Sequence, residues 1–144
     1  MCHNHLQLRV QISRAPAEGS LNLVFFNLST TEEAYLDRIK ACVDGTVRND
    51  LFIIRPVSNL NQQLNYLGPS IQIRGSDDQI YQTLPPGGSF STVVNLIGSY
   101  DFHQWRIRGV LNFITYYQSF HWHPRCQILE QLRSNEITLV FSAS

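Results

Sequence analysis

The sequence predicts an all-β protein, an antiparallel β-sandwich of about seven to nine strands with one short helix in a crossover. Apolar and polar residues alternate over several short stretches. Clusters of Gly, Pro, Asn, Asp and Ser separate these stretches about every 8–12 residues. The 144 residues have the length of one domain and contain no internal repeat or low-complexity tract. We therefore expect residues 1–144 to form a single domain.

The first half of the chain contains two clear strands. Residues 6–12 alternate strictly, with Leu8, Val10 and Ile12 between polar neighbours, which predicts one buried and one solvated face. Turn residues at 15–20 lead into a second alternating strand at 21–28.

Residues 29–47 are predicted to hold the crossover helix. Ser29 precedes Glu32 by three positions, which is the order of a capping box. Ala34, Leu36, Ile39 and Cys42 would form a short apolar stripe on such a helix.

The second half reads as a succession of strands and turns. Strands are expected at residues 51–54, 71–74, 80–84 and 89–97, the last two flanking a Pro-Pro-Gly-Gly turn. Residues 105–117 are predicted to form one long strand with a bulge at Gly109. A loop at 119–127 and a final strand at 136–141 follow.

The charge content argues against several classes of partner. Charged residues make up 15% of the chain, below the roughly 25% of average globular proteins. Acidic and basic residues are equal in number and Lys40 is the one lysine, so we expect no nucleic-acid partner. A near-neutral surface also favours self-association, for example as a homodimer.

The terminus and the cysteines favour a cytoplasmic location. No apolar run approaches the roughly 20 residues that span a bilayer, so no membrane partner is expected, and residues 1–7 lack the pattern of a secretory signal. Cys2, Cys42 and Cys126 are an odd set with no Cys-x-x-Cys pair. Free thiols in a reducing cytoplasm are the simplest interpretation.

The second half also resembles a known group of immunoglobulin-like domains. The resemblance rests on Thr-Leu-Pro-Pro-Gly-Gly-Ser-Phe at residues 83–90, Tyr-Asp-Phe at 100–102, the glycine-led strand at 109–113 and Ser-Asn-Glu-Ile-Thr-Leu at 134–139. These segments look like the non-catalytic domain of deuterolysin-type metallopeptidases and like intracellular immunoglobulin-like proteinase inhibitors. The resemblance covers residues 50–141 and implies an immunoglobulin-like sandwich. The segment 119–133 is longer than in that pattern, and the metallopeptidase half is missing, so no peptidase activity carries over.

No arrangement for catalysis is recognisable in the chain. There is no Gly-x-Ser-x-Gly elbow and no His-Glu-x-x-His motif. Asp77 and Asp78 sit in a predicted turn, where aspartates usually bond to their own backbone. We expect a protein that is not an enzyme and has no cofactor.

One cluster nevertheless offers a metal-site alternative. His121, His123 and Cys126 lie within six residues, and imidazole and thiolate are ligands of zinc and copper. Two histidines at i and i+2 of a strand point to the same face. If the first strand lay nearby, Cys2, His3 or His5 would complete the site. The competing interpretation is an ordinary polar and aromatic loop, since no known zinc spacing is matched.

An aromatic stretch at residues 116–123 predicts the binding surface, because it is too long to bury entirely. Exposed Tyr, Trp and Arg are preferred anchors of protein interfaces, so Tyr117, Phe120, Trp122 and Arg125 are the expected binding residues. The alternative is that these rings plug an open end of the sandwich.

These features predict a protein-binding module. Within this class, the most specific function that we expect is that of a cytosolic proteinase inhibitor, with a protease as its partner. Residues 120–126, stiffened by Pro124, would form the rigid loop that enters the protease. A metal-binding or hydrolytic protein and a carbohydrate-binding module remain the alternatives.

Overall fold

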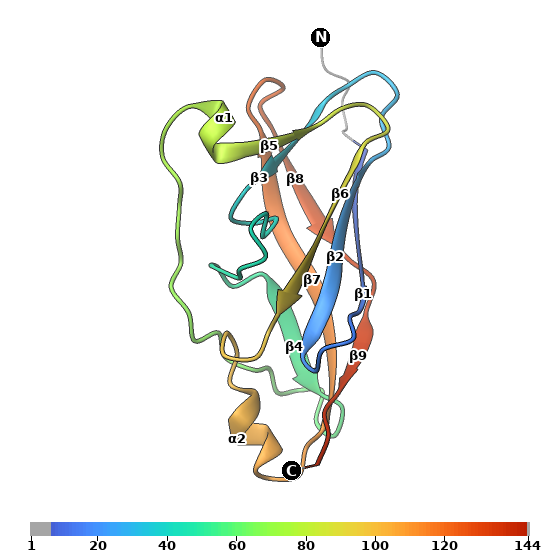
Figure 1. Cartoon of the computed structure of the whole chain (residues 1–144), viewed down its shortest axis with the longest axis vertical. Helices are drawn as coiled ribbons and strands as arrows, with labels where there is room; N and C mark the ends of the chain where they lie inside the picture. The colour runs from blue at the N-terminus through green and yellow to red at the C-terminus, as the bar shows by residue number, and fades with distance from the viewer. Residues whose placement is uncertain (1–6, 144) are drawn as a thin grey trace.

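The regular secondary structure of the protein consists almost entirely of antiparallel strands (Figure 1). The computed structural model describes residues 7–143. Within these residues the strands are β1 (Leu8–Arg14), β2 (Ser20–Asn27), β3 (Ala34–Asp37), β4 (Phe52–Pro56), β5 (Tyr81–Leu84), β6 (Ser89–Asn95), β7 (Asn112–His123), β8 (Ile128–Arg133) and β9 (Ile137–Val140). Two short helices, α1 (Asp77–Ile80) and α2 (Phe102–Arg106), complete the elements.

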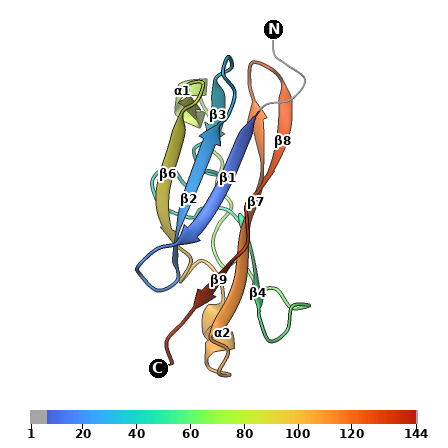
Figure 2. The ribbon, with the colours of Figure 1, turned by 90° about the vertical axis from the view of Figure 1, so that its right-hand side faces the viewer.

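The strands form two layers that enclose the core, as Figure 2 shows. One layer is the sheet β1-β2-β6, and the other is β4-β7-β8 with β9 also paired to β7. The short pair β3-β5 lies near helix α1, at one end of the molecule (Figure 1). The rings of Phe25 on β2 and Tyr117 on β7 meet edge to face at 5.5 Å between centroids, so the inner faces of the two layers are in direct contact.

The long strand β7 organises the second layer. Its first half pairs with β4 on one side and β9 on the other, and its second half pairs with β8. Gln118 faces Arg133 and Thr115 faces Ile137, so two residues of β7 lie opposite three residues, 134–136. One extra residue on one strand is a β-bulge, which bends the strand and increases its twist.

The bulge connects the two layers through Asn135. Its side-chain carbonyl accepts a hydrogen bond from the Ile12 backbone N–H at 2.9 Å, and its amide donates to the Ile12 carbonyl at 2.9 Å. The side chain therefore acts as a strand partner for β1 at the edge of the first sheet, where β1 runs beside β8 and β9.

The helix predicted for residues 29–47 was wrong. This segment contains β3, which pairs with β5, followed by turns through residue 44. The Ser29 hydroxyl accepts the N–H groups of Thr31 and Glu32 in a turn, and does not begin a helix. The apolar side chains of the expected stripe are buried by the sheets, because tertiary pairing outweighs a weak helical pattern.

Two other elements also differ from expectation. Trp105 lies in helix α2, and Gly109, with φ of 85°, closes the turn after this helix, so it is not a bulge in a strand. The strand expected at residues 71–74 is irregular and mostly exposed. The strands around the Pro-Pro-Gly-Gly turn and the burial of Val10 and Ile12 are confirmed.

Candidate functional site

The segment predicted as a loop at 119–127 is instead a two-stranded arm. We call residues 118–133 the β7–β8 arm; its strands pair from Gln118 and Arg133 to His123 and Ile128. The turn between them is closed by the Gln127 N–H, which donates to the His123 carbonyl at 2.8 Å. Side chains of a strand point alternately to opposite faces, so the arm has an outer face and an inner face with different chemistry.

The outer face is apolar and exposed. Phe120, Trp122 and Leu129 expose 45%, 43% and 58% of their surface, and Trp122 is the cross-strand neighbour of Leu129. Toward the β4 side, the Arg133 guanidinium lies 4.1 Å from the centroid of the Tyr116 ring. A shallow groove of about 130 Å³ continues this face, lined by Arg55, Leu60, Ile114, Tyr116 and Glu136.

The structure separates the four predicted anchors. Phe120 and Trp122 lie on the outer face as expected, and Arg125 is exposed in the turn, 5.9 Å from the Tyr35 ring centroid. Tyr117 was a wrong prediction, because it is fully buried between the layers. Its position in β7 gives it the inward orientation of residues 119, 121 and 123.

The inner face carries polar residues where a strand usually carries apolar ones. His121 and His123 are both buried, which confirms that they share one face. The Tyr117 hydroxyl donates to the Lys40 carbonyl at 2.7 Å, so it must accept its second bond, of 2.8 Å, from the Nε2–H of His121. Nδ1 of His121 is then a buried acceptor, and it has no hydrogen-bond partner in the part of the chain that the structure describes.

His123 is held by the backbone through both ring nitrogens. Its Nδ1 accepts from the Cys126 N–H at 2.9 Å, so Nε2 carries the proton and donates to the Glu33 carbonyl at 3.0 Å. These bonds join the end of β7 to its own turn and to the segment before β3. Binding a metal through His123 would break one of them.

The cysteines differ from one another. Cys42 is free and buried, and burial, with a smaller contribution from Asp44, raises the pKa of its thiol to about 12. Cys126 is disulfide-bonded, so the expectation of free thiols was wrong for it. This bond occupies the sulfur that the metal hypothesis required as a thiolate.

The geometry does not favour the metal alternative. Of its three proposed ligands, His123 and Cys126 are engaged, and among residues 7–143 no group of three His, Cys, Asp or Glu side chains is arranged to hold a metal ion. Cys2, His3 and His5, which were to complete the site, lie outside the described residues.

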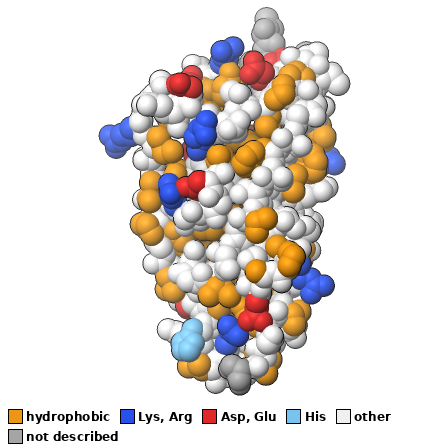
Figure 3. Space-filling view, viewed as in Figure 1, with side chains coloured by type: hydrophobic (Ala, Val, Ile, Leu, Met, Phe, Trp, Pro, Cys, Tyr) orange, Lys and Arg blue, Asp and Glu red, His pale blue; other side chains and the backbone are white. Residues whose placement is uncertain are grey.

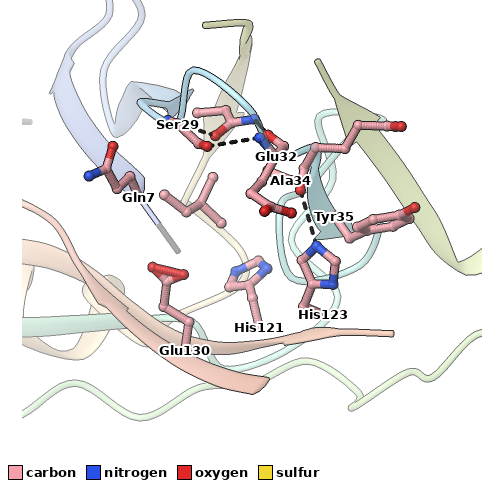
Figure 4. A pocket seen from close by; sticks show the side chains of 11 residues that line it. Gln7, Ser29, Glu32, Ala34, Tyr35, His121, His123 and Glu130 are labelled. Carbon is pink, nitrogen blue, oxygen red and sulfur yellow. Dashed lines mark hydrogen bonds between the residues drawn. The ribbon is translucent and has the colours of Figure 1, made fainter. Parts of the chain in front are cut away.

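Glu130 is the residue of this region that sequence reasoning missed. It lies opposite His121 on β8, and Figure 4 shows the two side chains next to each other in a pocket also lined by Gln7 and Tyr35. The enclosed space is about 10 Å³, close to the smallest that holds one water molecule. Oε2 of Glu130 is buried without a partner among the described residues. Only the pairing of β7 with β8 places it there, since an isolated Glu in a strand is usually exposed.

Burial shifts the pKa values of Glu130 and His121 in the directions that favour their uncharged forms. It raises the pKa of Glu130 to about 7, although a hydrogen bond with the Leu8 backbone acts in the opposite direction. It lowers the pKa of His121 to about 3, and the positive charge of Lys40 adds to this effect. At neutral pH His121 is therefore an uncharged hydrogen-bonding group inside the arm, which is a structural role.

The face of the molecule drawn in Figure 3 shows no large patch of a single charge sign. Figure 3 shows acidic, basic and hydrophobic side chains interspersed over the face in view. No helix in residues 7–143 is both long and apolar enough to cross a membrane. Comparison with known proteins found no matching family model and no similar curated protein.

Proposed function

We propose that this protein is a binding module that recognises another protein through the outer face of the β7–β8 arm. The observation that carries the proposal is the apolar surface made by Phe120, Trp122 and Leu129, all of them more than 40% exposed and adjacent in the strand register. Large aromatic side chains are the usual anchors of protein interfaces. The groove beside Tyr116 would receive the edge of the same partner.

The arm is firmly held from its inner face, which supports this proposal. Tyr117, His121 and His123 tie it to Lys40 and Glu33 by hydrogen bonds. The Lys40 ammonium also donates to the Phe120 carbonyl at 2.7 Å. A pre-organised surface loses less conformational entropy on binding than a mobile one.

Within this class we propose a proteinase inhibitor of immunoglobulin-like architecture. The turn at 124–127 projects from the end of the arm (Figure 2) and is braced by the Cys126 N–H bond to His123 and by the Gln127 N–H bond. Arg125 is exposed in this turn, which suits a protease that cleaves after basic residues. The two layers, with the turn at residues 85–88 leading from β5 to β6 in a different sheet, are compatible with the immunoglobulin-like resemblance.

Photo-crosslinking tests the protein-binding proposal. A photoreactive phenylalanine analogue is placed at Phe120, and as a control at Val93, which is also exposed but lies on the other layer. We expect one dominant protein adduct from position 120 in an extract of cells that make this protein, abolished by Trp122→Ala. Equal adducts from both positions, or an adduct that Trp122→Ala does not change, would contradict the proposal.

Inhibition kinetics test the finer proposal separately. Purified proteases of basic, aromatic and small-residue specificity are titrated with the protein. We expect inhibition of a protease with basic specificity, weakened at least about tenfold by Arg125→Ala and unchanged by Arg9→Ala, whose side chain is exposed on β1. Rapid cleavage at Arg125 without inhibition would show that the turn is a substrate.

A further inference from the structure

A second region outside the arm has the features of a ligand site. Residues 57–76, between β4 and α1, contain no helix or strand apart from a single bridge at Tyr66. Irregular segments longer than about 12–15 residues are uncommon in compact domains and often functional. This one begins after β4 near α2, at the end of the molecule opposite to the turn of the β7–β8 arm, and then runs along the molecule to α1 at the other end (Figure 1).

Hydrogen bonds hold the middle of this segment against residues 99–101, which directly precede α2. The Asp101 carboxylate accepts the Asn65 backbone N–H at 2.8 Å and the Asn65 side-chain amide at 3.2 Å. The Leu67 N–H donates to the Ser99 carbonyl at 2.8 Å. The segment is thus anchored where it passes α2, and its polar side chains are presented from a defined backbone.

Between the segment and α2 lies a pocket of about 480 Å³, within the range of about 300–1,000 Å³ that small-molecule sites occupy. Amide side chains dominate its lining, which consists of Asn59, Gln62, Gln63, Asn65, Asp101, Gln104, Trp105 and Arg108.

Three of these amide side chains are available to bond with a ligand. The side chains of Gln62, Gln63 and Gln104 form no hydrogen bond with any residue in the range 7–143. An amide group offers donors and an acceptor together. This combination matches hydroxyl groups, which also donate and accept.

The remaining lining narrows the ligand class. Trp105 packs against the core, and the Arg108 guanidinium lies 5.5 Å from its ring centroid. The Asp101 carboxylate is already engaged by Asn65. One arginine is too little positive charge for a phosphate cluster, and an apolar ligand would leave the amides unpaired.

We propose that this pocket binds a neutral oligosaccharide, with Gln62, Gln63 and Gln104 bonding to its hydroxyl groups beside Trp105 and Arg108. The proposal is separate from the protein-binding surface, because the pocket shares no lining residue with the outer face of the arm or with the groove beside Tyr116. Each can therefore fail while the other holds.

Tryptophan fluorescence tests the proposal directly, because the chain has two tryptophans. Trp122→Phe changes an exposed position on the arm and leaves Trp105 as the only reporter. This variant is titrated with cellulose, chitin, starch and β-1,3-glucan oligosaccharides, and the unmodified protein is applied to an array of neutral glycans. We expect a saturable change of Trp105 fluorescence with at least one of these sugars.

Substitutions then locate the binding site. In the Trp122→Phe background, the double change Gln62→Ala and Gln104→Ala should weaken binding about tenfold or more, since two hydrogen bonds are lost. Gln131→Ala, on the exposed face of β8, should leave affinity unchanged.

Three results would overturn the proposal. They are no saturable signal with any sugar of the panel or array, equal affinity of the Gln62→Ala, Gln104→Ala variant, and a stronger response to inorganic phosphate than to sugars.

Discussion

Tyr117 joins several parts of the molecule through its ring and its hydroxyl group. Its ring contacts Phe25 and Phe52 edge to face, at 5.5 Å and 5.6 Å between centroids, and its hydroxyl bonds with Lys40 and His121. Burial raises the pKa of this phenol well above its ordinary value, so the group stays protonated and continues to donate. Tyr117, which the sequence predicted to be an exposed binding residue, is instead a buried residue that connects neighbouring segments.

Tyr117→Phe should lower the free energy of unfolding by about 1–3 kcal/mol, because it leaves the Lys40 carbonyl and the His121 N–H without their bond. The neighbouring change Tyr116→Phe is the matched control, since no hydrogen bond of the Tyr116 hydroxyl is found within residues 7–143. Urea denaturation of both variants measures the difference. An equal decrease in the free energy of unfolding for both variants would show that the hydrogen bonds of the Tyr117 hydroxyl do not contribute to stability.

Glu130 should make stability depend on pH in a defined direction. Its pKa is about 7 in the folded protein against an ordinary value of 4.5, so the folded state binds the proton more tightly. Stability from this group is complete below about pH 4.5 and is lost as pH rises through 7. His121 has the opposite effect. Its pKa of about 3 in the folded protein lies below the ordinary value of 6.5, so its contribution to stability is lost as pH falls from 6.5 toward 3.

Glu130→Gln should therefore remove the loss of stability that occurs when Glu130 ionises at higher pH. We expect the Tm of the variant, relative to the unchanged protein, to rise between about pH 4.5 and 7 and to level off above this range. Thermal unfolding followed by circular dichroism at a series of pH values measures it. Glu136→Gln, at an exposed position, is the control. A Tm difference that does not vary with pH would exclude a buried carboxyl at position 130.

The bulge at residues 134–136 decides how the two layers meet at the edge formed by β1. Without the extra residue, every side chain of β9 would change faces, because the side-chain period of a strand is two. With it, Leu139 remains buried and the Asn135 side chain reaches the backbone of Ile12.

Asn135→Ala should lower the free energy of unfolding by about 1–3 kcal/mol, because two hydrogen bonds between the layers disappear and leave the Ile12 N–H and carbonyl unpaired. Asn22→Ala is the comparison, since among the described residues the Asn22 side-chain amide donates only to Ser13 and Arg14, on the neighbouring strand at an exposed position. Chemical denaturation distinguishes them. A larger loss for Asn22→Ala would mean that the inter-layer bonds are unimportant.

The whole molecule combines zero net charge with an exposed apolar face. Its sequence pI is about 7.0, so electrostatic repulsion between copies is weakest near neutral pH. Phe120, Trp122 and Leu129 can then pair with the same face of another copy when no partner is present.

The double change Phe120→Ser and Trp122→Ser should reduce self-association near pH 7 without lowering the Tm by more than a few degrees, because both side chains are exposed. Sedimentation velocity over a range of concentrations measures the association. Val93→Ser, at an exposed apolar site on the other layer, is the control. Unchanged association in the double variant would place the self-contact elsewhere.

The sequence by itself determined that the chain is built of antiparallel strands, and it located the two strands on either side of the Pro-Pro-Gly-Gly turn. Those features are local: alternation with period two fixes a buried face, and turn residues fix the backbone between strands. It also identified Phe120 and Trp122 as exposed aromatic residues, since so dense an aromatic stretch cannot be buried entirely. The proposed binding role of these residues stays a prediction.

Only the tertiary structure decided the rest, because it depends on which segments pair. Residues 34–37 form a strand since β5 lies beside them, despite their helical pattern. The arm inverts the usual order, with His121 and Glu130 inside and Trp122 and Leu129 outside, and no local propensity specifies that orientation. The buried polar pocket and the amide-lined pocket join residues distant in the chain, so neither exists until the fold is complete.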